Sequence, residues 1–175
     1  MNNQPPATAP AAGRRSNPSA WRHRIPVIVL ALVGLAIATT LTLFQTGVLD
    51  SVWEPFFGDG SRQVLHSSIS EALPIPDASL GAAAYLLEAI LESIGSTNRW
   101  RERPWVPAAA GLVAAGLGVA ALGLVAVQIW LVGAFCTLCL CSAAISLTVA
   151  ALAAPETLAA GRVLWTQHLA REKAR

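Results

Sequence analysis

Long apolar runs, separated by short polar or charged segments, dominate the pattern of this chain. Four of these runs predict membrane-crossing helices, at residues 25–49, 78–94, 105–130 and 132–154. The first, third and fourth carry no charged residue and are long enough for a hydrocarbon core of about 30 Å. The second is shorter and carries Glu88 and Glu92 on one helical face, so it is expected to cross only within a bundle. The pattern therefore predicts an all-α membrane protein built as a four-transmembrane-helix bundle.

The composition agrees with a single integral membrane domain. The chain has 175 residues, of which 54% are hydrophobic and only 13% charged, far from the balance of a soluble protein. A net charge of +2 indicates no basic surface of the kind that binds nucleic acid. Three cysteines are too few for a disulfide-stapled secreted scaffold, and their clustering within residues 136–141 favours a functional role.

The polar segments set the expected domain limits and the orientation in the cell membrane. Residues 1–24, rich in proline and small polar residues, predict a disordered tail, residues 25–154 the membrane domain, and residues 155–175 a basic tail. Arginines gather in both tails and in the connection at residues 95–104. The positive-inside rule therefore places both termini and this connection in the cytoplasm. With four crossings, the long loop at residues 50–77 and the start of the fourth span lie on the extracytoplasmic side.

Cys136 and Cys139 are separated by two residues at the start of the fourth span. This spacing lets the sulfurs meet across the first helical turn, where the helix dipole favours a thiolate. In an oxidising compartment such a dithiol predicts thiol–disulfide exchange and electron transfer to a lipid-soluble acceptor. The alternative is a pair of inert, buried membrane cysteines. Cys141 faces another side of the helix and is expected only to pack. A zinc site from the three cysteines and His66 is not expected, because Cys139 and Cys141 cannot easily converge on one ion.

These features together resemble the vitamin K epoxide reductase family, whose members are four-helix membrane proteins with a Cys-x-x-Cys at the start of the last helix. Residues 73–81 (LPIPDASLG), followed by Tyr85, resemble the family's entry into its second helix. Residues 60–64 resemble the family's segment around a loop cysteine, and the similarity covers roughly residues 25–154. Helix number, order, orientation and motif spacing agree with one another.

The resemblance implies a quinone-linked thiol–disulfide oxidoreductase that reduces a quinone or a quinone epoxide. Cys136 and Cys139 are its implied redox pair, with Cys139 facing the quinone and Cys136 exchanging disulfides. Asp77 is implied to bond a quinone carbonyl in a pocket shared with Tyr85, and it is equally suited to cap the second helix. The implied quinone is of the menaquinone (vitamin K) or ubiquinone type, and no metal is implied.

One departure from the family concerns the loop at residues 50–77. Family members usually carry there a second cysteine pair that relays electrons from a partner, whereas this loop has no cysteine and Gly60 stands at the second position. A thiol donor, such as a thioredoxin-fold protein, is then expected to dock on the aromatic loop segment formed by Trp53, Pro55, Phe56 and Phe57. The alternative is a non-catalytic membrane scaffold or interaction protein that has lost the relay.

Three further ionisable residues keep open roles. His66 either relays protons for quinone reduction or is an exposed loop histidine. Glu92 lies near the cytoplasmic surface and is expected to be solvated or paired with Arg99. Glu88 lies deeper and is expected to face the bundle interior.

Overall fold

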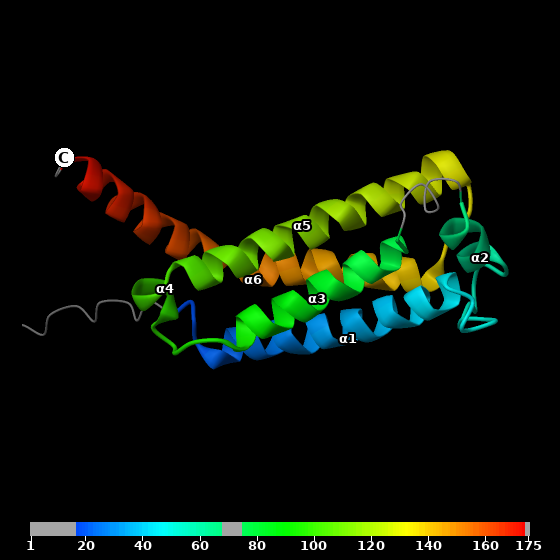
Figure 1. The fold of residues 1–175 in the computed structure, drawn as a ribbon, viewed down its shortest axis with the longest axis horizontal. Helices are drawn as coiled ribbons and strands as arrows, with labels where there is room; N and C mark the ends of the chain where they lie inside the picture. The colour runs from blue at the N-terminus through cyan, green and yellow to red at the C-terminus, as the bar shows by residue number, and fades with distance from the viewer. Residues whose placement is uncertain (1–16, 68–74, 174–175) are drawn as a thin grey trace, which may run out of the picture.

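In the structure, a computed structural model that describes residues 17–67 and 75–173, all regular elements are helical. Four long helices pack side by side as a bundle (Figure 1): α1 (Trp21–Gln45), α3 (Asp77–Ser93), α5 (Trp105–Val127) and α6 (Thr137–Lys173). The short elements are α2 (Gly60–Leu65), α4 (Arg99–Glu102) and a π-helical turn, η2 (Gln128–Val132). The all-α prediction is confirmed for this part of the chain.

Three helices in the described part are long and apolar enough to cross a membrane, Trp21–Gln45, Trp105–Val132 and Thr137–Lys173. Helix α3 has 17 residues. At 1.5 Å per residue it is roughly 26 Å long, which is shorter than a hydrocarbon core of about 30 Å. Its crossing, and with it the four-span topology, stays a prediction.

Helix limits differ from the predicted spans at both ends of the domain. Helix α1 begins at Trp21, before the expected start at residue 25, and most of the predicted disordered tail lies outside the described residues. Helix α6 begins later than expected, at Thr137, and continues through Pro155 to Lys173. Proline lacks a backbone N–H, so Pro155 predicts the end of the fourth span. The loss of one hydrogen-bond donor does not end the helix in the structure.

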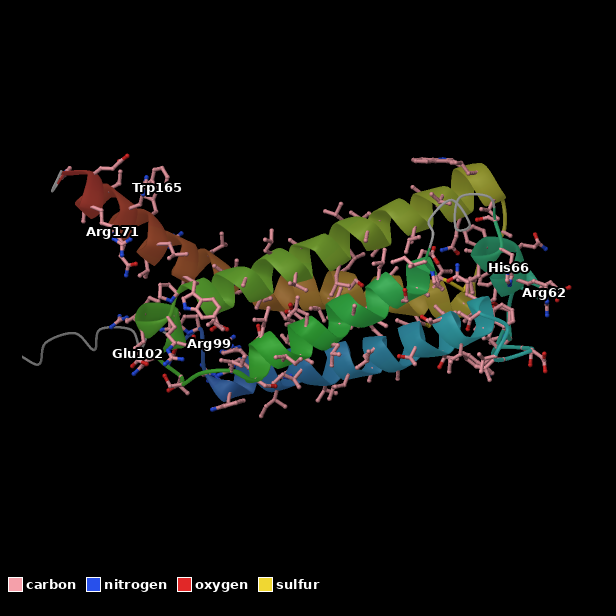
Figure 2. The ribbon with its side chains drawn as sticks, in the orientation of Figure 1. Arg62, His66, Arg99, Glu102, Trp165 and Arg171 are labelled. Carbon is pink, nitrogen blue, oxygen red and sulfur yellow. A yellow bond between two sulfur atoms is a disulfide. The ribbon has the colours of Figure 1, made fainter. Side chains whose placement is uncertain are left out.

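The two ends of the bundle differ in the short helices and the charged residues that they hold. Helix α2 and the start of α6 lie at one end, whereas α4 and the start of α1 lie at the other, where the last turns of α6 project beyond the bundle (Figure 1). Figure 2 shows Arg62 and His66 at the α2 end and Arg99, Glu102 and Arg171 at the opposite end. The described parts of the three arginine-rich segments, at the start of α1, in α4 and in the last turns of α6, therefore share one end of the molecule.

Small residues fill the bundle interior and large apolar residues cover its outside. Ala31 and Ala114 are buried, whereas Leu112 and Val119 are 76% and 71% exposed. A Cβ atom at Gly111 would overlap the side chain of Thr157, so this glycine is what lets α5 and α6 approach closely. An apolar exterior around a small-residue interior is the packing of membrane helices, because lipid is as apolar as the exposed side chains.

A buried ionic cluster joins the helices at the arginine-rich end. The Arg99 guanidinium donates to Glu92 Oε2 at 2.7 Å and to Glu156 Oε1 at 2.6 Å, and Ser19 Oγ donates to Glu156 Oε1 at 2.6 Å. Arg24 donates to three backbone carbonyls at the end of α3. Burial lowers the pKa of Arg99, but the carboxylates of Glu156 and Glu92 outweigh it, so the pKa lies above its ordinary value. Of the two states expected for Glu92, solvated or paired with Arg99, the structure has the pair, and Glu92 is buried.

Glu88 is fully buried, as expected for a side chain facing the bundle interior. Neither of its carboxylate oxygens has a hydrogen-bond partner among the described residues.

Candidate functional site

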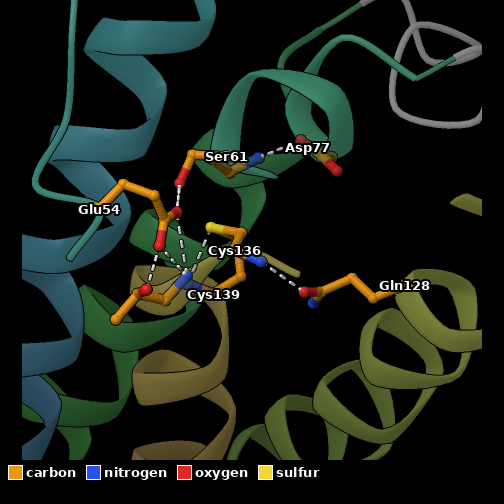
Figure 3. The surroundings of a disulfide bond; sticks show 8 residues. Glu54, Ser61, Asp77, Gln128, Cys136 and Cys139 are labelled. Carbon is orange, nitrogen blue, oxygen red and sulfur yellow. Dashed lines mark hydrogen bonds between the residues drawn. A yellow bond between two sulfur atoms is a disulfide. The ribbon is translucent and has the colours of Figure 1, made fainter. Parts of the chain in front are cut away.

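Cys136 and Cys139 are joined by a disulfide at the α2 end of the bundle (Figure 3). Cys136 is the residue directly before α6, and Cys139 lies in its first turn, with 5.2 Å between the two Cα atoms. The Cys139 backbone N–H points at Cys136 Sγ, 3.1 Å away. Cys141 is a free, exposed thiol. The pairing that the sequence predicted is therefore present, and Cys141 stands outside it.

Glu54, in the loop that follows α1, caps the N-terminus of α6 with its carboxylate. Both of its carboxylate oxygens lie 3.2 Å from the Thr137 backbone N–H, and the hydroxyls of Thr137 and Ser61 also donate to it (Figure 3). Burial raises the pKa of Glu54, but the hydrogen bonds from Ser61 and Thr137 outweigh it and hold this pKa below its ordinary value. An ionised carboxylate therefore occupies the helix terminus, where it satisfies free backbone donors and offsets the dipole that favours a Cys139 thiolate.

Helix α2 covers Cys136. Val64 and Leu65 pack in one apolar cluster with Cys136, which is fully buried. A Cβ atom at Gly60 would overlap the backbone carbonyl oxygen of Phe135. The position that the resemblance assigns to a loop cysteine therefore lies against the residue before Cys136, and in this chain it is packed too closely for a side chain.

A cavity of about 90 Å³ lies among the four long helices beside the disulfide. Its lining brings together the three residues that the sequence placed in one pocket, namely Cys139, Asp77 and Tyr85. Cys136 is not part of this lining. Most of the remaining wall is apolar, from residues such as Leu41, Leu117 and Leu124. We call this space the interhelical cavity.

Gln128, which the sequence reasoning missed, connects the disulfide to the interhelical cavity. It begins the η2 turn, lines the cavity and is 1% exposed. Its Oε1 accepts the Cys136 backbone N–H at 2.9 Å (Figure 3). Its Nε2 has no hydrogen-bond partner among the described residues. A single amide in an uncharged predicted span is the signal that could have identified it, because polar residues within membranes are costly.

The comparison with known families decides the identity of this helical, disulfide-containing bundle. Residues 25–154 match the model of the vitamin K epoxide reductase family. The chain belongs to this family. No curated protein matches its sequence. Membership confirms the resemblance and makes the protein a membrane protein of a family with thiol–disulfide and quinone chemistry.

In this vitamin K epoxide reductase family protein, the other two predicted pocket residues differ in their hydrogen bonding. Tyr85 is buried, and its hydroxyl bonds to the Ser142 carbonyl at 2.8 Å and to the hydroxyls of Ser142 and Ser146 at 3.0 and 2.7 Å. Asp77 is the first residue of α3, where its Oδ1 accepts the Ala78 backbone N–H at 2.8 Å. Tyr85 is thus held within the protein, whereas Asp77 Oδ2 has no hydrogen bond to the part of the chain that the structure describes.

His66 lies apart from the interhelical cavity. It is exposed at the end of α2, and its ring contacts Phe44 edge-on, with 6.0 Å between centroids. Of its two expected roles, this position fits the exposed loop histidine.

Proposed function

We propose that this protein is a quinone-linked thiol–disulfide oxidoreductase of the membrane, in which the Cys136–Cys139 dithiol reduces a quinone or a quinone epoxide. The observation that carries the proposal is the position of Cys139, which belongs to the disulfide and also lines the interhelical cavity with Asp77. A largely apolar cavity with a few polar groups suits a quinone ring, whose only polar atoms are its two oxygens. Family membership supplies the class of reaction.

The proposed reaction needs only the dithiol and the bound substrate. The sulfur of Cys139 attacks, and the sulfur of Cys136 then bonds to Cys139, which closes the disulfide as the product leaves. The dithiol loses two electrons and two protons, and a quinone gains both to become the quinol. With a quinone epoxide, the same electrons and protons yield the quinone and water. A protein dithiol then reduces the Cys136–Cys139 disulfide and becomes a disulfide itself.

The redox state of the cysteine pair tests this proposal directly. Protein reduced in liposomes and freed of reductant should oxidise at Cys136 and Cys139 when a ubiquinone or menaquinone analogue is added, and trapping with a mass-shifting maleimide reports the loss of two thiols. The Cys136→Ser variant supplies the matched control, because it cannot close the disulfide. Thiols that persist in the wild-type protein with quinone would favour the non-catalytic scaffold, which the absence of loop cysteines supports.

Asp77 is proposed as a quinone-binding residue. Because a carboxylate oxygen accepts hydrogen bonds, Oδ2, which has no partner among the described residues, suits the hydroxyl of the quinol product. We expect Asp77→Ala to weaken quinol binding several-fold, while the lost helix-terminus contact costs about 1 kcal/mol of stability. Quinol titration of the purified protein measures the first effect and thermal unfolding the second. Asp50→Ala, at an exposed loop position, is the control. Equal quinol affinity in wild type and Asp77→Ala would leave only the structural contact.

We also propose that all four long helices cross the membrane, with both termini and residues 95–104 in the cytoplasm. The support is that the start of α1, helix α4 and the last turns of α6, which hold the described arginines of these segments, lie at one end of the bundle (Figures 1 and 2). Introduced thiols in His66→Cys and Arg101→Cys, both exposed positions, test the orientation with an impermeant maleimide. In intact cells His66→Cys should react and Arg101→Cys should not, until the membrane is permeabilised. The reverse pattern would overturn the orientation.

The proposed electron donor is a thioredoxin-fold or other thiol protein that docks on the aromatic loop segment. Within it, Trp53 and Phe56 are 66% and 74% exposed. Because α2 buries Cys136, the donor has to displace α2 before its sulfur reaches Cys136. Docking beside α2 would bring the donor to the element that must move.

A further inference from the structure

We infer that Gln128 binds the quinone directly: its Nε2 donates a hydrogen bond to a ring carbonyl oxygen, while its Oε1 holds the backbone of Cys136. This inference rests on the proposed function, because it names the group that recognises the substrate of that same cavity. The observations are the burial of Gln128, its place in the lining of the interhelical cavity and the lack of a partner for Nε2 among the described residues.

The orientation of the Gln128 amide follows from its neighbour. The Cys136 backbone N–H is a donor, so the amide atom 2.9 Å from it has to be the oxygen. The NH₂ group is then the other end of the amide, and it belongs to a residue of the cavity lining. A buried donor without an acceptor is costly, whereas one that meets a ligand carbonyl is not. The site therefore lacks an acceptor, which is what a quinone ring carries.

The local backbone explains why the side chain reaches this place. Helix α5 ends in the π-helical turn η2, in which the Gly133 N–H donates to the Gln128 carbonyl at 2.9 Å. Gly133 has a φ of 68°, a left-handed conformation that favours glycine, and it turns the chain toward Cys136. Single π-turns are frequent at functional sites because they shift one residue out of the α-helical register. Here Gln128 is the first residue of the turn, and its carbonyl accepts the Gly133 N–H.

The proposed reaction step requires a hydrogen-bond donor at the quinone carbonyl. When a thiolate adds to a quinone, negative charge develops on a carbonyl oxygen, and a positioned N–H donor stabilises it. The Tyr85 hydroxyl already bonds to Ser142 and Ser146, and Asp77 Oδ1 already accepts the Ala78 N–H. Gln128 Nε2 is the unpaired donor in the described lining. Since the same amide holds Cys136, it also fixes the substrate relative to the disulfide.

Binding to the oxidised protein tests the inference without turnover. Menadione, which carries two ring carbonyls, is compared with methylnaphthalene, the same ring without them, by quenching of tryptophan fluorescence. At a pH at which its carboxyl is ionised, Gln128→Glu keeps an acceptor for the Cys136 N–H but loses the donor, and Gln128→Leu loses both at every pH. We expect each variant to bind menadione about tenfold more weakly than wild type, the effect of one hydrogen bond, with methylnaphthalene binding unchanged. Disulfide formation in each variant verifies the fold, and Gln128→Leu decides if Gln128→Glu does not fold.

The outcomes separate this inference from the proposed function. Unchanged menadione affinity in a folded variant would overturn the role of Gln128 and leave the proposed function standing. Equal weakening of both ligands would also overturn it, because Gln128 would then only shape the cavity. If wild-type protein binds neither ligand, the quinone site itself is wrong, and the inference falls with it.

Discussion

Replacement of Cys139 by serine is expected to reduce quinone turnover to the uncatalysed background. Cys139 is the sulfur that lines the interhelical cavity, and its partner Cys136 is buried beneath α2 and absent from that lining. Without Cys139, no sulfur faces the substrate and no disulfide can close. Turnover is measured from the absorbance of a soluble quinone analogue, with a small dithiol as the electron donor. Cys141→Ser is the matched control and should keep the wild-type rate, because Cys141 is free and exposed.

The same variant should reveal the protein partner. Cys136 alone can attack the disulfide of an oxidised thiol protein, which releases one partner thiol and leaves a mixed disulfide that Cys139 is no longer present to resolve. Non-reducing electrophoresis of Cys139→Ser membranes should therefore show a reducible adduct that is absent from a Cys136→Ser, Cys139→Ser double variant. Full turnover in Cys139→Ser would refute the assignment of the reacting sulfur. A missing adduct, with turnover lost as expected, would argue against the protein donor alone.

The broad architecture could be predicted because it depends on local sequence. The apolar runs predict α1, α5 and α6, because about twenty consecutive apolar residues are what a helix needs to cross the hydrocarbon core of a membrane. The pairing of Cys136 and Cys139 could also be predicted locally, because a spacing of two residues brings both sulfurs together within one helical turn. Asp77 and Tyr85 were expected beside Cys139 only from the resemblance to the family, and all three residues line one cavity.

The residues that the sequence did not reveal act through partners far along the chain. Glu54 bonds to Thr137, 83 positions later, and nothing around Glu54 marks it as the residue that closes α6. Glu156 follows a proline in what reads as a basic tail, yet it is 6% exposed because Arg99 and Ser19 bond to it. The burial of Cys136 likewise depends on α2 packing above it, which a pattern of single residues does not contain.

The second large effect is expected at the opposite end of the bundle, from Arg99→Ala. Arg99 is 1% exposed and connects α4 to Glu92 on α3 and Glu156 on α6. Its removal leaves Glu156 buried without its cation and leaves Glu92 only the longer pair with Arg24 at 3.6 Å, so we expect a loss of about 3–5 kcal/mol in the free energy of unfolding. Denaturant titration of the protein in detergent micelles measures it. Arg103→Ala, at an exposed position of the same connection, should change stability by less than about 0.5 kcal/mol.

The origin of that loss can be separated from simple loss of packing. If uncompensated charge is the cause, adding Glu156→Gln to Arg99→Ala should restore part of the stability, because the amide removes one buried negative charge at nearly constant volume. Arg99→Lys should fall between wild type and Arg99→Ala, since an ammonium keeps the charge but cannot reach both carboxylates with the fixed geometry of a guanidinium. If Glu156→Gln further destabilises Arg99→Ala, the cluster is held by shape and not by charge. The disulfide end, which lies at the far end of the bundle, should keep its Cys136–Cys139 pairing in each variant that folds.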